Sequence, residues 1–266
     1  MPEGRLHVKA SEGRTGLLVS PQNSASEGLE LEIIKLAPGD QEAGTAVGKE
    51  TLLVVMGGRV DLELNGVRWN ELGERANVFG GRATSAYLPP STEYVVRSPA
   101  GAEVALFRAL AGLGGAPYVI GPDDVDVATR GRDSFEREVH TILDTRKPAA
   151  ALVAGETFNA TGAWSSYPPH KHDVDDPPRQ ARLQEVYHFR IDPPQGFGIQ
   201  RIYSPERGLN EAFVVEDGDT VVIPFGYHPV VAAPGYRLYY LWALAGDGRD
   251  LRVVEDPVHG WVARQP

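Results

Sequence analysis

The chain has 266 residues, enough for one large domain or for two of roughly 130 residues each. Acidic residues outnumber basic ones by 36 to 26, and the formal net charge of −10 disfavours general binding to nucleic acids or anionic membranes. Cysteine is absent, which excludes disulfides, thiolate nucleophiles and cysteine-ligated metal centres. Any metal ion must therefore be held by carboxylates and by the seven histidines.

Short apolar runs rich in β-branched residues follow one another along the chain, separated by Gly, Pro, Asn and Asp. The predicted strands are 29–37, 51–66, 92–98, 102–110, 150–158, 184–191, 196–203, 211–216, 219–224 and 236–244. Their spacing, often roughly 8–12 residues, is typical of an all-β sandwich or barrel. Residues 133–143 are the best candidate for a short helix, with a connector and one strand as the alternative.

The two halves of the chain repeat one arrangement of turns and strands. A glycine turn, a strand, a proline turn and a further strand occur within 54–96 and again within 215–234. Residues 111–133 are rich in Gly and Asp, so we place a boundary there and predict domains at 1–130 and 131–266. A single continuous two-sheet sandwich is the alternative to this pair of barrels.

No secretory signal is evident near the N-terminus, and no run approaches the roughly 20 apolar residues that span a bilayer. These features predict a cytoplasmic protein without a membrane or nucleic-acid partner.

The most informative segment contains two histidines separated by one residue. Residues two apart in a strand point to the same face, so His170 and His172 project together and can share a divalent metal ion. Glu185 stands at the head of a later predicted strand, and His228 follows a turn with Pro and Gly. Three histidines and one carboxylate can therefore converge, and such a set leaves coordination sites open for substrate oxygens.

A His-x-His pair by itself is more often solvated surface than a metal site. Metal binding is favoured here by the all-β pattern, the following Glu185 and the later His228. His188 has the opposite strand parity to Glu185, so it is predicted to face away as an outward or structural histidine. His7, His140 and His259 have no partner at ligand spacing and are interpreted as surface or packing residues.

Together these clusters resemble the two cupin motifs. The residues that carry the resemblance are His170, His172, Glu185 and Gly196 in the first, and Gly218, Pro224, Gly226 and His228 in the second. Twelve residues separate His172 from Glu185, more than is usual in the motif, and one residue instead of two separates Gly226 from His228. The segment SSYPPHKHD with its acidic, proline-rich insert is similar to the 5-deoxy-glucuronate isomerases of inositol catabolism, a bicupin family of ketol isomerases.

That resemblance implies two tandem cupin barrels, each a double-stranded β-helix. It implies that a divalent ion (Zn, Mn, Fe, Co or Ni) is held by His170, His172, Glu185 and His228. The first half lacks His-x-His and has Thr92 and Glu93 where the second motif would place a histidine, so its barrel is expected not to bind metal. Homo-oligomerisation is expected by analogy with the family.

The implied reaction interconverts 5-deoxy-D-glucuronate and 5-dehydro-2-deoxy-D-gluconate, through either proton transfer or a hydride shift. Candidate catalytic or substrate-binding residues are Tyr187, Gln200, Arg201 and Tyr240. Gln200 and Arg201 have opposite parity, so only one of them faces the barrel interior. For the tyrosines the alternative is core packing, and for Arg201 it is the surface. The acidic insert is interpreted as a solvated loop or, alternatively, as a lid.

Cupin barrels host many reactions, so two other functions compete with the isomerase. An Fe-dependent dioxygenase would use the same ligands and consume oxygen. A sugar-binding cupin without turnover would be stabilised by its ligand and form no product. The extended match around His170 favours the isomerase.

Overall fold

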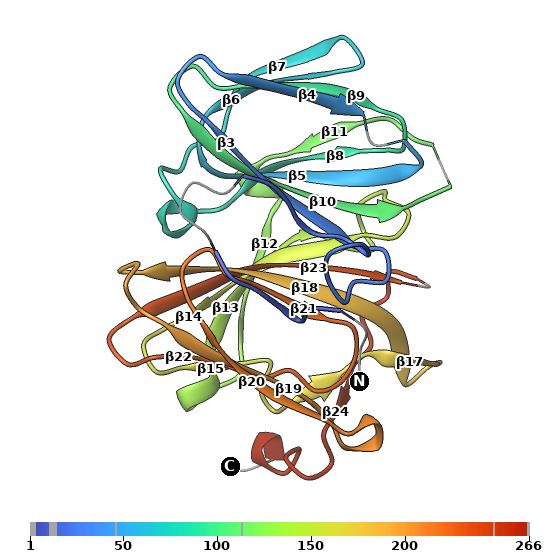
Figure 1. The fold of residues 1–266 in the computed structure, drawn as a ribbon, viewed down its shortest axis with the longest axis vertical. Helices are drawn as coiled ribbons and strands as arrows, with labels where there is room; N and C mark the ends of the chain where they lie inside the picture. Colours follow the sequence, from blue (N-terminus) through green and yellow to red (C-terminus); the bar gives the residue numbers. More distant parts are fainter. Residues whose placement is uncertain (1–3, 11–14, 46, 113, 247, 265–266) are drawn as a thin grey trace.

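β-Strands make up nearly all the regular structure of the chain, and the helical segments are 3₁₀ turns (Figure 1). The computed structural model describes residues 4–10, 15–45, 47–112, 114–246 and 248–264. The strands form two β-barrels, one above the other in Figure 1. The predicted all-β fold of two tandem barrels is thereby confirmed.

The first barrel consists of two facing sheets. The larger has the strand order β11-β8-β5-β10-β3-β2 and the smaller β4-β9-β6-β7. The strands are β2 (Gly16–Val19), β3 (Glu30–Leu36), β4 (Gln41–Thr45), β5 (Lys49–Gly58), β6 (Val60–Leu64), β7 (Val67–Leu72), β8 (Thr84–Leu88), β9 (Glu93–Arg97), β10 (Ala102–Leu110) and β11 (Tyr118–Ile120). Apolar side chains such as Leu53, Leu62 and Val96 fill the space between the sheets.

The second barrel carries the larger share of the strands. Its main sheet has the order β1-β21-β18-β23-β14-β13-β12, with β17 paired to β18, and it faces the sheet β15-β22-β19-β20, while β16 pairs with β24. The strands are β1 (His7–Val8), β12 (Asp126–Arg130), β13 (Arg137–Leu143), β14 (Val153–Asn159), β15 (Trp164–Ser165), β16 (His170–Lys171), β17 (Asp173–Asp176), β18 (Gln180–Asp192), β19 (Gly198–Ser204), β20 (Leu209–Val215), β21 (Thr220–Ile223), β22 (Val230–Ala232), β23 (Arg237–Gly246) and β24 (Val254–Glu255).

Sheet membership differs from the predicted division at residue 130 in two strands. β1 pairs with β21 and β12 pairs with β13, so both belong to the second barrel although they lie within 1–130. We propose that the boundary lies between β11 and β12, with the N-terminal strand crossing to the second barrel. Sequence could not show this for β1, because its partner β21 lies near the other end of the chain. It could not show β12 because that strand is largely exposed and lacks an alternating apolar pattern.

The ambiguous segment 133–143 contains no α-helix. Asp133–Phe135 form a 3₁₀ turn, and Arg137–Leu143 form β13 between β12 and β14. The connector-and-strand alternative is therefore correct. Strands β4 and β7 escaped prediction because they are polar and largely exposed at sheet edges, where no apolar alternation is required.

The larger sheets of the two barrels pack back to back (Figure 1), which explains the long apolar run of β5. One of its faces points into the first barrel, and the other, with Leu52 and Val54, contacts the second barrel, so the strand is buried on both sides. Buried Glu50 also joins the halves, because its carboxylate accepts hydrogen bonds from the backbone N–H groups of 150–152 and from the Tyr87 hydroxyl.

A buried ion pair crosses the same interface. The Arg75 guanidinium donates to both carboxylate oxygens of Glu156, at 2.6 and 3.2 Å, and the Tyr239 hydroxyl donates to the same carboxylate at 2.7 Å. Arg75 and Glu156 are 3% and 0% exposed, so each charge depends on the other for compensation.

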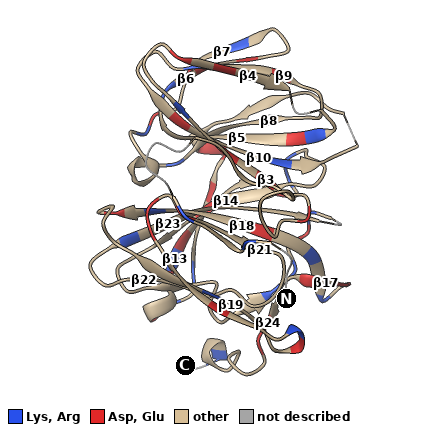
Figure 2. Ribbon diagram, viewed as in Figure 1, with Lys and Arg blue, Asp and Glu red and all other residues tan. Residues whose placement is uncertain are grey.

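Acidic and basic residues are interspersed over both barrels (Figure 2). Within the described ranges, no helix is long and apolar enough to cross a membrane.

Candidate metal centre

Three histidines from distant parts of the chain meet inside the second barrel. His170 lies in β16, His172 follows it directly before β17, and His228 lies between β21 and β22. One ring nitrogen of each histidine lies within 4.8 Å of the corresponding atoms of the other two. His172 and His228 are 3% and 0% exposed, while His170 is more open. The predicted convergence of these histidines is therefore found.

Glu185 on β18 completes this cluster. Its Oε2 lies 3.2 Å from Nε2 of His172 and 3.3 Å from Nε2 of His228. Burial by itself would raise the pKa of Glu185, but the interactions with the two neighbouring imidazoles outweigh that effect and lower it to about 2. The carboxylate is therefore ionised at neutral pH.

Hydrogen bonds at the far sides of the rings orient two of the histidines. Nδ1 of His172 is 2.8 Å from the Leu183 carbonyl, and Nδ1 of His228 is 2.9 Å from the Gly226 carbonyl. If Nδ1 carries the proton that each carbonyl accepts, Nε2 of the neutral ring presents a lone pair to the cluster. The Nε2 atom of His228 is buried and makes no hydrogen bond.

This donor set needs a cation. Two imidazole lone pairs and a carboxylate at 3.2–3.3 Å repel one another unless a proton or a metal ion lies between them. Burial, together with the neighbouring His228 and His172, holds the pKa of His170 well below its usual value, which keeps that ring neutral as a metal ligand must be. Carbonyl-oriented imidazoles with one carboxylate fit a divalent ion such as Zn²⁺, Mn²⁺ or Fe²⁺.

His188 points away from the cluster, as its strand parity predicts. Its Nδ1 lies 2.9 Å from Oγ1 of Thr220, and the side chain is buried between the barrels at 2% exposure. Burial, and next the charge of Arg190, lowers the pKa of His188 to about 3. His188 is thus a neutral packing residue.

We expect His188 to make stability fall in acid. In the unfolded chain its pKa returns to about 6.5. Protons therefore bind the unfolded state preferentially as pH drops from about 6.5 towards 3, and the free energy of unfolding decreases by up to about 1.4 kcal/mol per pH unit. Chemical denaturation at pH 4.5–7 should show a shallower decline for His188→Gln than for the unsubstituted protein. Equal slopes in the two proteins would contradict this assignment.

The remaining histidines lie outside the cluster. His7 pairs with Asp219 at 3.0 Å and His140 with Glu138 at 2.7 Å. His259 lines a cavity of about 660 Å³ on the outer side of β15 and β19.

Both candidate tyrosines lie in the barrel interior. Tyr187 has its hydroxyl 3.0 Å from Oγ of Ser166, and Tyr240 donates to Oγ of Ser165 at 3.0 Å. Their ring centroids are 4.2 Å apart, and the Tyr187 ring is 6.0 Å from that of His228. Burial raises the pKa of both phenols, that of Tyr187 well above its usual value, so both are neutral hydrogen-bond donors at physiological pH.

Gln200 and Arg201 occupy opposite faces of β19. Gln200 is fully buried, and its Nε2 donates to the carbonyl of His228 at 2.7 Å. Arg201 is exposed on the outer face, where it stacks on Tyr203 and bonds to Asn210. Its position does not fit the predicted contact with substrate inside the barrel.

The polar residues that contact these tyrosines inside the barrel were not among the site residues predicted from the sequence. Ser165, Ser166 and Asn159 line the same face, and Nδ2 of Asn159 donates to Oγ of Ser165 at 2.9 Å. The only signal was the pair of serines three residues before the first histidine motif.

The acidic insert forms a hairpin of β17 with β18. Asp173 is buried and accepts from Gln180 and from the Gly226 backbone N–H, so it fixes the turn that carries His228. Residues 174, 175 and 177–179 of the insert are exposed, as expected for the predicted solvated segment, whereas the structural role of buried Asp173 was not predicted.

In the first barrel the position equivalent to the second motif is structural. The Thr92 hydroxyl donates to the Pro89 carbonyl, and Glu93 is exposed. Among the described residues, the second barrel's histidines are the only group arranged to hold a metal ion.

Comparison with known proteins agrees with this architecture. A family model described as the KduI/IolB family matches residues 6–262. A curated relative from Geobacillus kaustophilus (strain HTA426), named 5-deoxy-glucuronate isomerase, is 39% identical over 258 residues, which cover 96% of this chain and 93% of that protein. The protein of the same name from Bacillus subtilis (strain 168) is 33% identical over 246 residues, covering 92% and 91% of the two chains.

Solved structures extend the comparison to the fold. The crystal structure of an IolB-like protein from Salmonella typhimurium LT2 has a TM-score of 0.93 and 32% identity, covering 97% of this chain and 99% of that chain. Lactobacillus farciminis oxalate decarboxylase, with a TM-score of 0.66, 12% identity and coverage of 95% and 87%, shares the fold alone. Since the family model spans almost the whole chain and relatives exceed 30% identity over most of it, the chain belongs to the KduI/IolB family.

Proposed function

We propose that this protein is a metal-dependent aldose–ketose isomerase that converts 5-deoxy-D-glucuronate into 5-dehydro-2-deoxy-D-gluconate. The observation that carries the proposal is the buried cluster of His170, His172, His228 and Glu185, whose facing acceptor atoms repel one another unless a proton or a metal ion lies between them. The name shared by relatives that match more than 90% of the chain supports the choice of substrate.

The proposed ligands are these four residues, and the ion is one of Zn, Mn, Fe, Co or Ni. When bound, a divalent ion would supply a Lewis acid for the substrate's carbonyl and neighbouring hydroxyl oxygens. Ionised Glu185 keeps the centre less positive, while the carbonyls of Leu183 and Gly226 hold two of the imidazole rings in place.

The tyrosines serve as proton-holding groups in this proposal. A neutral Tyr187 hydroxyl, fixed by Ser166 close to His228, can donate a hydrogen bond to a substrate oxygen on which negative charge develops. Tyr240, fixed by Ser165 beside Tyr187, can do the same. Their raised pKa values suit them to donation and not to the removal of a carbon-bound proton.

The test is an anaerobic assay of the purified protein loaded in turn with each of the five metals. We expect the keto acid to form, as followed by NMR, without oxygen or an external electron acceptor. Turnover in D₂O would place solvent deuterium on the product if a proton is transferred and would leave it unlabelled after a hydride shift.

Each alternative gives a different result in that assay. A dioxygenase would act only with Fe and consume oxygen, and a binding module would be stabilised by the sugar acid without forming product. If none of the five metals supports product formation, the isomerase proposal is refuted. The cytoplasmic location and the homo-oligomeric state stay predictions from the sequence.

A further inference from the structure

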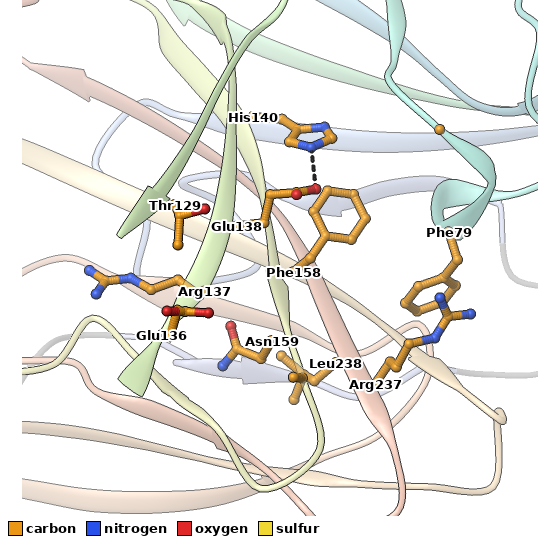
Figure 3. A pocket seen from close by; sticks show the side chains of 12 residues that line it. Phe79, Thr129, Glu136, Arg137, Glu138, His140, Phe158, Asn159, Arg237 and Leu238 are labelled. Atoms are coloured by element: carbon orange, nitrogen blue, oxygen red, sulfur yellow. Dashed lines mark hydrogen bonds and ion pairs between the residues drawn. The ribbon is translucent and has the colours of Figure 1, made fainter. Parts of the chain in front are cut away.

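Strand β13 brings a basic residue to the inner face of the second barrel. Arg137 lies opposite Asn159 in the antiparallel pair of β13 and β14. Opposite residues share a face, and Asn159 faces inward, since it bonds to Ser165, which also bonds to Tyr240. Figure 3 shows the side chains of Arg137 and Glu138 on opposite sides of the strand, with Glu138 beside His140.

The charge of Arg137 has no carboxylate partner among the described residues. Its Nη1 donates to the Phe135 carbonyl at 3.3 Å, and no ion pair involves it. Arg130 lies opposite Arg137 on β12, so a second cation shares that face. Like charges directly opposite in a sheet destabilise it, and an anion bound beside Arg137 would relieve this repulsion from exposed Arg130.

Arg137 also lies close enough to the metal cluster to act on it electrostatically. The pKa of His170 is lowered chiefly by burial, then by His228 and His172, and the charge of Arg137 adds to that lowering. Burial raises the pKa of Tyr240, and the same guanidinium opposes that rise. Asn159, opposite Arg137, is joined through Ser165 to Tyr240, whose ring centroid lies 4.2 Å from that of Tyr187 beside His228, so contacts connect the inner face of β13 with the histidine cluster.

Between these ends, two inward-facing side chains of the barrel have buried acceptors without donors. Oδ1 of Asn159 and Oε1 of Gln200 are buried and make no hydrogen bond. Gln200 is on the inner face, because it lies opposite Val230, which in turn lies opposite Ser165. A buried acceptor without a donor is costly unless a ligand hydroxyl supplies one.

We propose that Arg137 binds the carboxylate of the sugar acid, so that the substrate lies with its aldehyde end at the histidine cluster and its acid end at β13. The hydroxyl groups between them donate to Asn159 and Gln200. This inference rests on the proposed function, because it takes a sugar acid as the substrate. It makes Arg137, and not Arg201, the residue that selects an acid over a neutral sugar.

The test compares Arg137→Met with the unsubstituted protein on two substrates. For 5-deoxy-D-glucuronate we expect KM to rise about 10- to 100-fold, as for the loss of a charge-assisted hydrogen bond. For 5-deoxy-D-glucose, which has CH₂OH in place of the carboxylate, KM should change less than about threefold. The KM of Arg137→Lys for 5-deoxy-D-glucuronate should lie between those of Arg137→Met and the unsubstituted protein, because lysine keeps the charge but lacks the planar pair of donors.

Misfolding of a variant, a wrong proposed function and a wrong role for Arg137 each give a different result. Metal content and Tm are measured for each variant, and stabilisation by the keto-acid product reports binding without turnover. Arg68→Met, which removes an exposed arginine of the first barrel, is the surface control. Inactivity of the unsubstituted protein refutes the isomerase. If that protein is active, two results for Arg137→Met would overturn the role of Arg137. One is that neither KM for 5-deoxy-D-glucuronate nor stabilisation by the product changes, and the other is that KM rises equally for both substrates.

Discussion

Replacement of His228 by alanine is expected to remove the bound metal and to lower kcat about a thousandfold or more. The estimate follows because a Lewis acid contributes several kcal/mol to the transition state, and each 1.36 kcal/mol is a factor of ten in rate. His228 is fully buried, and its Nε2 faces Glu185 at 3.3 Å, so no solvent group can readily take its place. Elemental analysis of the folded variant and steady-state kinetics check this outcome.

The same loss is expected for His170→Ala and His172→Ala, and for Glu185→Gln, which keeps the shape of the side chain but removes its charge. His188→Ala is the matched control, because His188 lies on the opposite face of β18 from Glu185. It should retain its metal. Full metal content and activity in any ligand variant would remove that residue from the proposed set, and loss of metal in His188→Ala would contradict the geometry of β18.

Arg75→Met is expected to destabilise the fold by about 3–5 kcal/mol, because it leaves the Glu156 carboxylate buried without its counter-charge. At roughly 2–4 °C per kcal/mol for a domain of 150–250 residues, Tm should fall by about 10 °C. Differential scanning calorimetry and chemical denaturation measure the change.

Two further variants isolate the cause. Arg68→Met breaks an exposed pair with Glu63 and should cost at most about 1 kcal/mol. The double variant Arg75→Met/Glu156→Gln removes both buried charges and should recover much of the stability lost in Arg75→Met. If Arg75→Met were as stable as the surface control, the ion pair would not hold the barrels together.

The site could be predicted largely because its signals are local. Strand parity correctly separated Glu185 from His188 and Gln200 from Arg201, since alternation of faces is a property of any extended backbone. Arg75 and Glu156, by contrast, are 81 residues apart, and nothing near either of them marks it as buried. Arg137 was missed for a related reason, because segment 133–143 was ambiguous and its pairing with β14 was unknown.

By itself, the sequence indicated the all-β class, the repeat of two barrels and the histidines that meet in the second barrel. These follow from alternation, turn residues and the scarcity of possible ligands in a chain without cysteine. Only the tertiary structure decided that β1 and β12 join the second barrel, that Glu50 and Arg75 link the halves, and that Arg137 lies opposite Asn159. The contacts of β1, Glu50 and Arg75 join residues far apart in the chain, and their free energy comes from packing that no short segment contains. β12 and the start of β13 pair locally, but they are exposed or half-buried and lack the apolar alternation that would mark them as strands.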